Sequence, residues 1–129
     1  GEVVTPFFGF SLATDMRFAS EDMNYYLSHA RYGLHPSGAL PFFLSRYLHH
    51  SKATEMLIRG GKITAKKALN LGLITKIVDD KDFEQGCIKR LKKYTEICHS
   101  SLRNTKRLIN FQRRELEDYF EYEASILNL

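Results

Sequence analysis

The spacing of the apolar residues changes near Ala39, and this change limits the folds that the chain can adopt. Before Ala39, short apolar runs alternate with Gly, Pro and turn-forming residues, as in short strands joined by loops. After it, apolar residues recur at steps of three and four, as on one face of a helix. The sequence therefore predicts short strands and loops over residues 1–40 and a mainly helical remainder.

The first forty residues divide into short segments. Strands are expected at residues 3–5, 16–19 and 24–27, where β-branched and aromatic residues gather. The apolar run 7–13 suits a buried helix or a buried strand, and its periodicity does not separate the two. Residues 29–38 contain two glycines and a proline, which predicts a loop.

Three helix starts are marked in the middle of the chain. Pro41 fits the first turn of the first helix. Ser51 is expected to cap the second helix. Gly60 and Gly61 are expected to end it. Thr64 is expected to cap a third, short helix that stops at Gly72.

A strand is expected at residues 73–78, and two helices over the rest. The first of these helices runs over 82–99, with Asp82 as its cap. Its apolar stripe consists of Cys87, Leu91, Tyr94 and Cys98. The second runs over about 100–126, and a helix of that length cannot bury itself in so small a chain. We expect it to pack on a further segment or on another subunit.

Length and composition bound the class of protein. The 129 residues, 43% hydrophobic and 26% charged, indicate one globular domain. No apolar run is long enough for a transmembrane helix, and no leader marks secretion. The two cysteines form no framework, so we expect free buried thiols in a reducing compartment. A cytoplasmic protein is expected, with mitochondrial or peroxisomal placement as the alternatives in a eukaryote.

The net charge of +4 is concentrated in residues 86–114, which hold nine basic residues and one acidic residue. Such a segment suits nucleic acid, an acidic membrane or a phosphate-bearing ligand, or it is a solvated helix face. The sequence lacks the Cys/His spacing of a zinc finger and the aromatic-glycine signature of an RNA-binding sheet. We therefore favour the solvated face, and expect no nucleic-acid partner and no membrane partner.

Four segments of the chain carry motifs in a fixed order. They read ATDMRFASE at 13–21, YYLSHARYG with a later proline and glycine at 25–38, KATEMLIRGG at 52–61, and ITAKKALNLGL at 63–73. Together these phrases resemble those of the crotonase superfamily, which includes the enoyl-CoA hydratases and isomerases. The resemblance covers roughly residues 9–80.

The resemblance implies an α/β fold. It assigns residues 1–80 to the last turns of a strand–strand–helix (ββα) spiral, and residues 81–129 to C-terminal helices used for packing or oligomerisation. It also implies that the family's domain is about twice as long, with an N-terminal half outside this sequence. The intact protein is then expected to associate with itself as a trimer or hexamer.

The resemblance further implies chemistry on a CoA thioester by hydration, isomerisation or hydrolysis. The intermediate is an enolate, which two backbone amides stabilise. Counting back from Asp15 places one amide at Pro6, which has no N–H, so Phe7 is the next candidate. The two glutamates that the family uses as general acid and base fall at Gly9 and His29.

His29 is therefore the expected catalytic residue, because an imidazole exchanges protons near neutral pH. The residues expected to bind the substrate are Phe7, Phe8, Tyr25, Tyr26 and Gly38. No metal site and no separate cofactor are expected, because CoA enters as part of the acyl-CoA substrate.

Three alternatives stay open. Pro6, Gly9 and His29 also suit a diverged member that binds or assembles without catalysis. With a histidine at position 29, the chain resembles superfamily members that cleave carbon–carbon bonds in β-diketones. Those members also use an aspartate in the loop where this chain has Ser37 and Gly38. The basic C-terminal region leaves a nucleic-acid or chromatin-associated scaffold as the third alternative.

Overall fold

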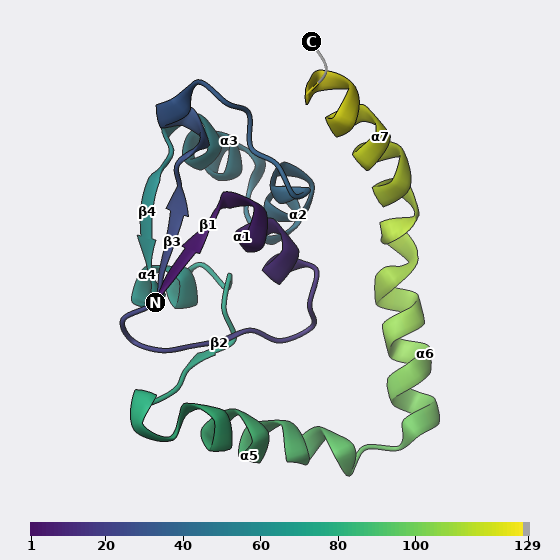
Figure 1. The fold of residues 1–129 in the computed structure, drawn as a ribbon. Helices are drawn as coiled ribbons and strands as arrows, with labels where there is room; N and C mark the ends of the chain where they lie inside the picture. The colour runs from purple at the N-terminus through teal and green to yellow at the C-terminus, as the bar shows by residue number, and fades with distance from the viewer. Residues whose placement is uncertain (128–129) are drawn as a thin grey trace. The chain divides into compact units, whose positions relative to one another are not determined.

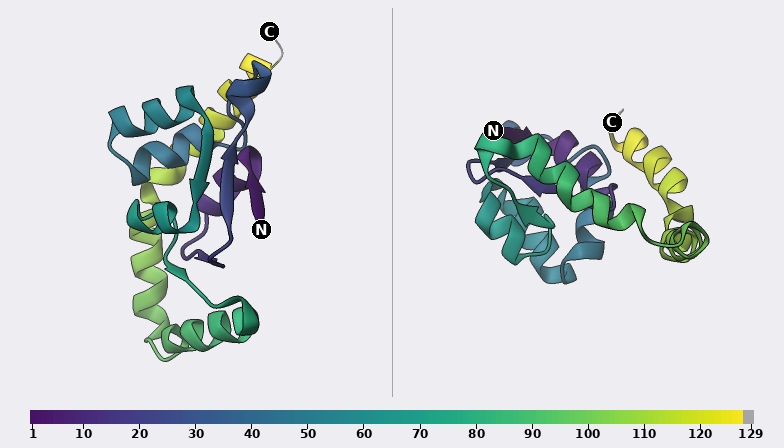
Figure 2. Two further views of the ribbon diagram at one scale, coloured as in Figure 1. Left: turned by 90° about the vertical axis from the view of Figure 1, so that its left-hand side faces the viewer. Right: turned by 90° about the horizontal axis from the view of Figure 1, so that it is seen from below.

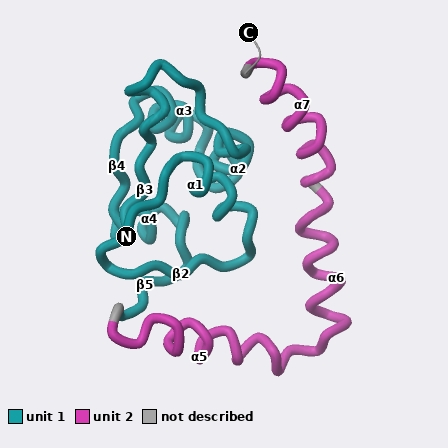
Figure 3. The backbone as a smooth tube through the Cα atoms, in the orientation of Figure 1, with its two compact units in different colours: residues 1–80 teal, residues 81–129 magenta. Residues whose placement is uncertain are grey.

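The chain divides into two compact units, residues 1–80 and residues 81–129, which Figure 3 colours separately. The structure, a computed structural model, describes residues 1–127 and the side chains within that range except those of residues 80, 112 and 127. Within the described range the first unit holds the strands, and the second consists of helices (Figure 1).

The first unit is built around a small sheet. Its strands are β1 (Glu2–Val4), β2 (Phe18–Ala19), β3 (Asn24–Leu27), β4 (Gly61–Thr64) and β5 (Lys76–Ile77). The main sheet has the order β1-β3-β4, and Figures 1 and 2 show these strands side by side. β1 runs parallel to β3, whereas β4 runs antiparallel to it. β2 and β5 form a separate parallel pair.

The helices of the first unit alternate with these strands. They are α1 (Thr5–Leu12), η1 (His29–Tyr32), α2 (Leu40–Tyr47), α3 (His50–Arg59) and α4 (Ala65–Asn70), and η2 (Asp80–Asp82) leads into the second unit. The largest fully buried side chains are Phe8, Leu12, Leu27, Leu40, Leu44 and Leu73. Because burying one such side chain contributes about 1.5–3 kcal/mol, this core draws stability from segments on both sides of Ala39.

The apolar run after β1 forms the helix α1. The periodicity of its sequence suited a buried helix or a buried strand equally. Pro6 lies in the first turn of α1, where its missing N–H removes no helical hydrogen bond. Phe8 and Leu12 are fully buried, whereas Phe7 and Phe10 are 67% and 68% exposed. α1 is therefore apolar on its exposed side too, and no amphipathic period marks it in the sequence.

β4 is a strand that the sequence pattern did not predict. Gly60 and Gly61 have φ angles of +66° and +96°, and Gly60 ends α3, as expected. The chain enters β4 at once, and only Ile63 of its residues is buried. A single buried residue gives no alternation, so the pattern that identifies a half-buried strand is missing.

The two central helices begin near their expected positions, but the second has a different cap. Pro41 lies in the first turn of α2, as predicted. α3 begins at His50, so Ser51 lies inside the helix, and the prediction that Ser51 is its N-cap is wrong. The Ser51 hydroxyl instead lies 3.0 Å from Nδ1 of His49, which occupies the cap position.

The segment after α4 differs from its prediction. The strand expected over residues 73–78 is reduced to β5, because the Leu73 N–H donates to the Ala68 carbonyl and closes the helix instead.

The other differences in the first unit concern the residues at which elements begin. The strand expected over 16–19 begins at Phe18, and the loop expected over 29–38 opens with η1.

Arg17 explains why residues 73–75 do not extend the strand. Its buried guanidinium donates from Nε to the Leu73 carbonyl at 2.5 Å and from Nη1 to the Thr14 carbonyl at 2.6 Å. It also lies 4.6 Å from the centroid of the Tyr47 ring. The Thr75 N–H donates to the Arg17 carbonyl at 2.7 Å, and the Thr75 hydroxyl accepts from the Arg17 N–H. The Leu73 carbonyl and the Thr75 backbone are therefore both held by Arg17.

Thr64 caps α4, as predicted: its hydroxyl accepts a hydrogen bond from the Lys67 N–H at 3.3 Å. We expect Thr64→Ala to lower the free energy of unfolding by about 1 kcal/mol, because this N–H then loses its acceptor. Ser51→Ala is the matched control and should be near neutral, because Ser51 caps no helix. Urea denaturation of the three proteins checks this, and equal midpoints for Thr64→Ala and the parent would contradict it.

The second unit consists of α5 (Phe83–Thr95), α6 (His99–Ile109), η3 (Asn110–Glu115) and α7 (Leu116–Leu127). The helix expected over 82–99 ends at Thr95, so its predicted end is wrong. Asp82 occupies the N-cap position, as predicted, but its side chain makes no cap hydrogen bond. Within residues 1–127, no helix is both long and apolar enough to cross a bilayer.

The single helix expected over 100–126 is interrupted by η3. The Arg114 guanidinium lies 4.3 Å from the centroid of the Phe111 ring. Residues three apart come into line in a 3₁₀ helix, so this cation–π contact favours the tighter turn over a continuous α-helix.

The two thiols differ from their expected setting. Both are free, but Cys87 is half-buried and Cys98 is exposed, so the prediction that both are buried is wrong. Cys98 also leaves the expected stripe, because it lies beyond the end of α5 at the N-cap position of α6.

Candidate functional site

The predicted site residues come from three neighbouring parts of the first unit: the first turn of α1, the end of β3 with η1, and the loop before α2. Because β1 and β3 are parallel, the segments that follow them leave the same edge of the sheet. The Thr5 hydroxyl lies 3.2 Å from the Tyr26 carbonyl oxygen and 3.4 Å from Nδ1 of His29. The fold thus brings Tyr26 and His29 to the start of α1.

His29 is buried, and both of its ring nitrogens have neighbours. Nε2 lies 2.8 Å from the Leu57 carbonyl oxygen, which can only accept, so Nε2 carries the proton of the neutral ring. Nδ1 then lies beside the Thr5 hydroxyl, whose single proton is donated either to Nδ1 or to the Tyr26 carbonyl. Leu57 belongs to the last turn of α3, whose final carbonyls lack helical partners, so His29 caps that helix end. The expected loop position is therefore a buried position in η1 that links two helices.

Two of the predicted substrate-binding residues belong to the core. The Phe8 and Tyr25 rings stack with centroids 3.9 Å apart, and both side chains are buried. Burial raises the pKa of Tyr25, whose hydroxyl lies 3.4 Å from Oγ of Ser11. Phe7, by contrast, points away from the core at 67% exposure and offers an apolar surface beside the helix start.

Gly38 and Gly9 mark a close approach of two backbones. Gly38 has a φ of +71°, and a Cβ there would lie 2.6 Å from the Pro6 carbonyl oxygen. A Cβ on Gly9 would lie 2.1 Å from the Gly38 carbonyl oxygen and 2.9 Å from the Leu40 nitrogen. The loop before α2 therefore rests directly on α1, and the position expected to carry a family glutamate has no room for a side chain.

The first turn of α1 holds the candidate oxyanion donor. Val4 precedes the helix without a side-chain cap hydrogen bond, and Pro6 contributes no N–H. The N–H of Phe7 is one of those that an α-helix leaves without an acceptor in its first turn. This N–H lies at the positive end of the helix dipole, where a developing negative charge is stabilised.

Carboxylates do not contribute to this region. Among the described residues of the first unit, the buried polar side chains are Thr5, Arg17 and His29. The part of the chain that the structure describes also holds no group of three or more His, Cys, Asp or Glu residues placed to bind a metal ion. His29 is therefore the buried acid–base candidate among the described residues of this unit.

Sequence reasoning missed two polar residues near this region. Thr5 was assigned to a strand, yet its hydroxyl connects Tyr26 and His29. His35 lies in the loop before α2, with Nδ1 3.2 Å from the Pro36 carbonyl oxygen and Nε2 buried without a partner among the described residues. Neither belongs to a motif, so only the fold reveals them.

The family model and several of the similar proteins carry the name of one family. The model of the enoyl-CoA hydratase/isomerase family matches residues 1–128. Enoyl-CoA delta isomerase 2 of Homo sapiens is 32% identical over 101 residues, which are 78% of this chain and 26% of that protein. Probable enoyl-CoA hydratase 1, peroxisomal, of Arabidopsis thaliana is 32% identical over 109 residues, 84% of this chain and 38% of that protein.

The solved structures give the same result for the fold. The crystal structure of enoyl-CoA hydratase from Bacillus halodurans superposes with a TM-score of 0.87 at 28% identity, covering 97% of this chain and 51% of that one. The chain thus spans about half the length of this neighbour, and between about a quarter and two fifths of the two relatives.

Proposed function

The chain belongs to the enoyl-CoA hydratase/isomerase family, and we propose that it forms the C-terminal part of a protein that processes an acyl-CoA thioester through an enolate. The observation that carries this proposal is the first turn of α1. There the Phe7 N–H, left without a helical acceptor, lies at the positive end of the helix dipole. It would supply one oxyanion donor, and a segment outside this sequence would supply the second.

His29 would be the acid or base of the reaction. Its support is its place: it is the buried imidazole next to the start of α1, with Nδ1 directed at Thr5. Because Nε2 is held by the Leu57 carbonyl, Nδ1 is the atom that would accept the substrate proton. Hydration by two glutamates, as elsewhere in the family, is not part of the proposal, because Gly9 leaves no space for a carboxylate.

A second candidate is a member that binds acyl-CoA or assembles without catalysis. Two observations favour it: Pro6 removes an N–H from the helix start, and both ring nitrogens of His29 are engaged within the fold. The two candidates share acyl-CoA binding and differ in turnover. Turnover of bound acyl-CoA therefore separates them.

Assembly and compartment belong to the same proposal. Self-association, as a trimer or hexamer, would cover exposed apolar side chains such as Leu34 and Ile58. Light scattering of the full-length protein measures it. A cytoplasmic location is proposed, with the peroxisome as the alternative, because the similar Arabidopsis protein is named as peroxisomal.

The test uses the full-length protein with a panel of saturated and unsaturated acyl-CoAs, measuring binding by calorimetry and turnover by absorbance. We expect saturable binding, and Phe7→Asp should weaken turnover and acyl-CoA binding roughly tenfold, because its charge repels a thioester enolate and the anionic CoA. Phe10→Asp is the matched control: Phe10 is equally exposed on α1 but lies about one turn further from the helix start.

Each outcome decides between the candidates. Binding with turnover supports the enzyme, and binding of the whole panel without turnover supports the second candidate. Absence of acyl-CoA binding, or equal losses in the Phe7→Asp and Phe10→Asp variants, contradicts the proposed site.

A further inference from the structure

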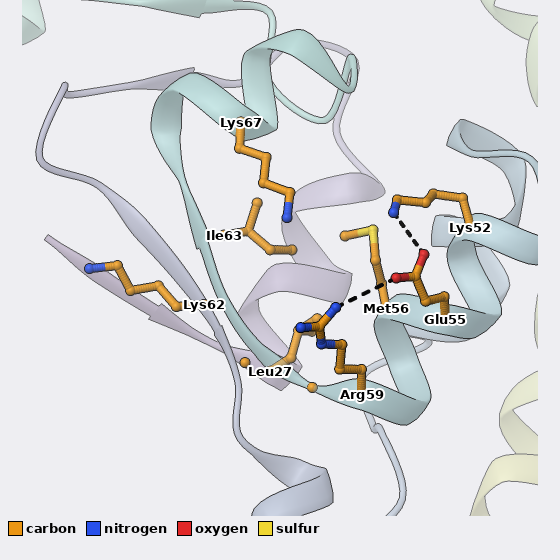
Figure 4. Close-up of a pocket in the computed structure, with 10 residues that line it drawn as sticks. Leu27, Lys52, Glu55, Met56, Arg59, Lys62, Ile63 and Lys67 are labelled. Atoms are coloured by element: carbon orange, nitrogen blue, oxygen red, sulfur yellow. Dashed lines mark hydrogen bonds and ion pairs between the residues drawn. The ribbon is translucent and has the colours of Figure 1, made fainter.

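A cavity of about 300 Å³ lies between α3, β4 and α4 (Figure 4). Its apolar lining consists of Leu27, Met56 and Ile63, which are themselves buried. None of the residues that line it belongs to the set around Phe7 and His29. The cavity is therefore separate from the acyl-CoA site proposed above.

Cationic side chains surround this cavity. Lys52, Arg59 and Lys67 line it together with one acidic residue, Glu55. The Lys67 ammonium reaches over the cavity toward Ile63, whereas the Lys62 side chain points away (Figure 4). Three cations thus face a single carboxylate.

Glu55 neutralises only part of this charge. Its carboxylate accepts from the Lys52 ammonium at 2.7 Å and lies 3.8 Å from the Arg59 guanidinium. The hydrogen bond from Lys52 holds the pKa of Glu55 below its usual range, so Glu55 is ionised at neutral pH. The carboxyl end of α3 adds about half a negative charge. The three cations exceed both together, and the surplus favours an anion.

We propose that this cavity binds a small phosphate-bearing anion. A phosphate monoester carries about 1.5 to 2 negative charges at neutral pH, which is close to the surplus of about 1.5 positive charges left after Glu55 and the helix end. Lysine ammonium groups bind phosphate as point charges, and arginine adds a forked donor. A cavity of 300 Å³ lies at the lower end of ligand-pocket volumes, which suits a small ligand.

The experiment titrates inorganic phosphate into the full-length protein, with binding followed by ³¹P NMR and by the rise in melting temperature. Lys67→Met should weaken phosphate binding roughly tenfold, because it removes one charge-assisted hydrogen bond. Lys66→Met is the matched control: this neighbouring lysine of α4 is exposed but does not line the cavity. Glu55→Gln should tighten phosphate binding, because it removes the competing carboxylate.

A second arm identifies the source of the phosphate. If CoA binds more tightly than dephospho-CoA and Lys67→Met abolishes the difference, the phosphate belongs to CoA. If Lys67→Met weakens phosphate binding but leaves the difference in affinity between CoA and dephospho-CoA unchanged, the ligand is a free phosphate or another phosphate ester. Failure of phosphate to saturate, or equal losses in Lys66→Met and Lys67→Met, would overturn the proposal. Because phosphate alone is the probe, this result is independent of whether the protein turns over acyl-CoA.

Discussion

Replacing Gly9 by alanine will lower the free energy of unfolding by up to about 2 kcal/mol, against the direction that helix propensity predicts. In a helix interior, alanine is favoured over glycine by about 1 kcal/mol. Here the added Cβ would lie 2.1 Å from the Gly38 carbonyl oxygen, so the loop before α2 must move away from α1. Overpacking of this kind costs about 1–3 kcal/mol and occasionally more, which exceeds the gain in propensity.

Urea denaturation of the full-length protein measures this effect, with Phe10→Ala as the control on the exposed side of α1. The control should change stability by no more than about 0.5 kcal/mol, because it alters no packed contact. Gly9→Glu should destabilise the protein further, so restoring the family's carboxylate here will not restore hydration. A Gly9→Ala variant as stable as the parent would show that the two backbones are not in close contact.

Replacing His29 by alanine will also destabilise the fold, contrary to the expectation for a loop residue. The variant leaves the half-buried Leu57 carbonyl without its donor, and the loss of such a hydrogen bond costs about 0.5–1.5 kcal/mol. A loss of turnover in His29→Ala would therefore mix unfolding with any catalytic effect. Thermal denaturation of the full-length variant measures the structural part alone.

His29→Gln separates the two roles, because its amide can still donate to Leu57 but cannot exchange a proton at neutral pH. If His29 is the acid or base, His29→Gln should recover most of the stability and still lose about a hundredfold or more in turnover. If turnover on any accepted acyl-CoA equals that of the parent, His29 is a helix cap and the catalytic role is wrong.

The sequence predicted several parts of the fold that depend on local chemistry. The proline in the first turn of α2, the glycine that ends α3 and the Thr64 cap of α4 each act within a few residues and were predicted correctly. The crotonase-type α/β fold, predicted from the motifs, is confirmed by the superposition on the Bacillus halodurans enzyme. Local signals and ordered motifs therefore determined the element types and the family.

Several of the parts that failed depend on contacts between distant segments. Residues 73–75 are held by Arg17, more than fifty residues earlier, so no local pattern distinguishes them from a strand. In the candidate site, the sequence identified His29 but not its setting, because Leu57 and Thr5 meet it only in the folded chain. The close approach of Gly9 to Gly38 is hidden for the same reason.

The contacts of Arg17 also determine when the first unit can fold while the ribosome synthesises the chain. Its guanidinium and backbone need Leu73 and Thr75, which lie 56 and 58 residues further along. While the chain is still being made, a buried Arg17 would lack the Leu73 acceptor, so the segment around β2 must stay hydrated on the ribosome. The first unit therefore completes its folding only when its last few residues have emerged. A ribosome stalled before Leu73 should hold a chain that protease still cleaves near Arg17.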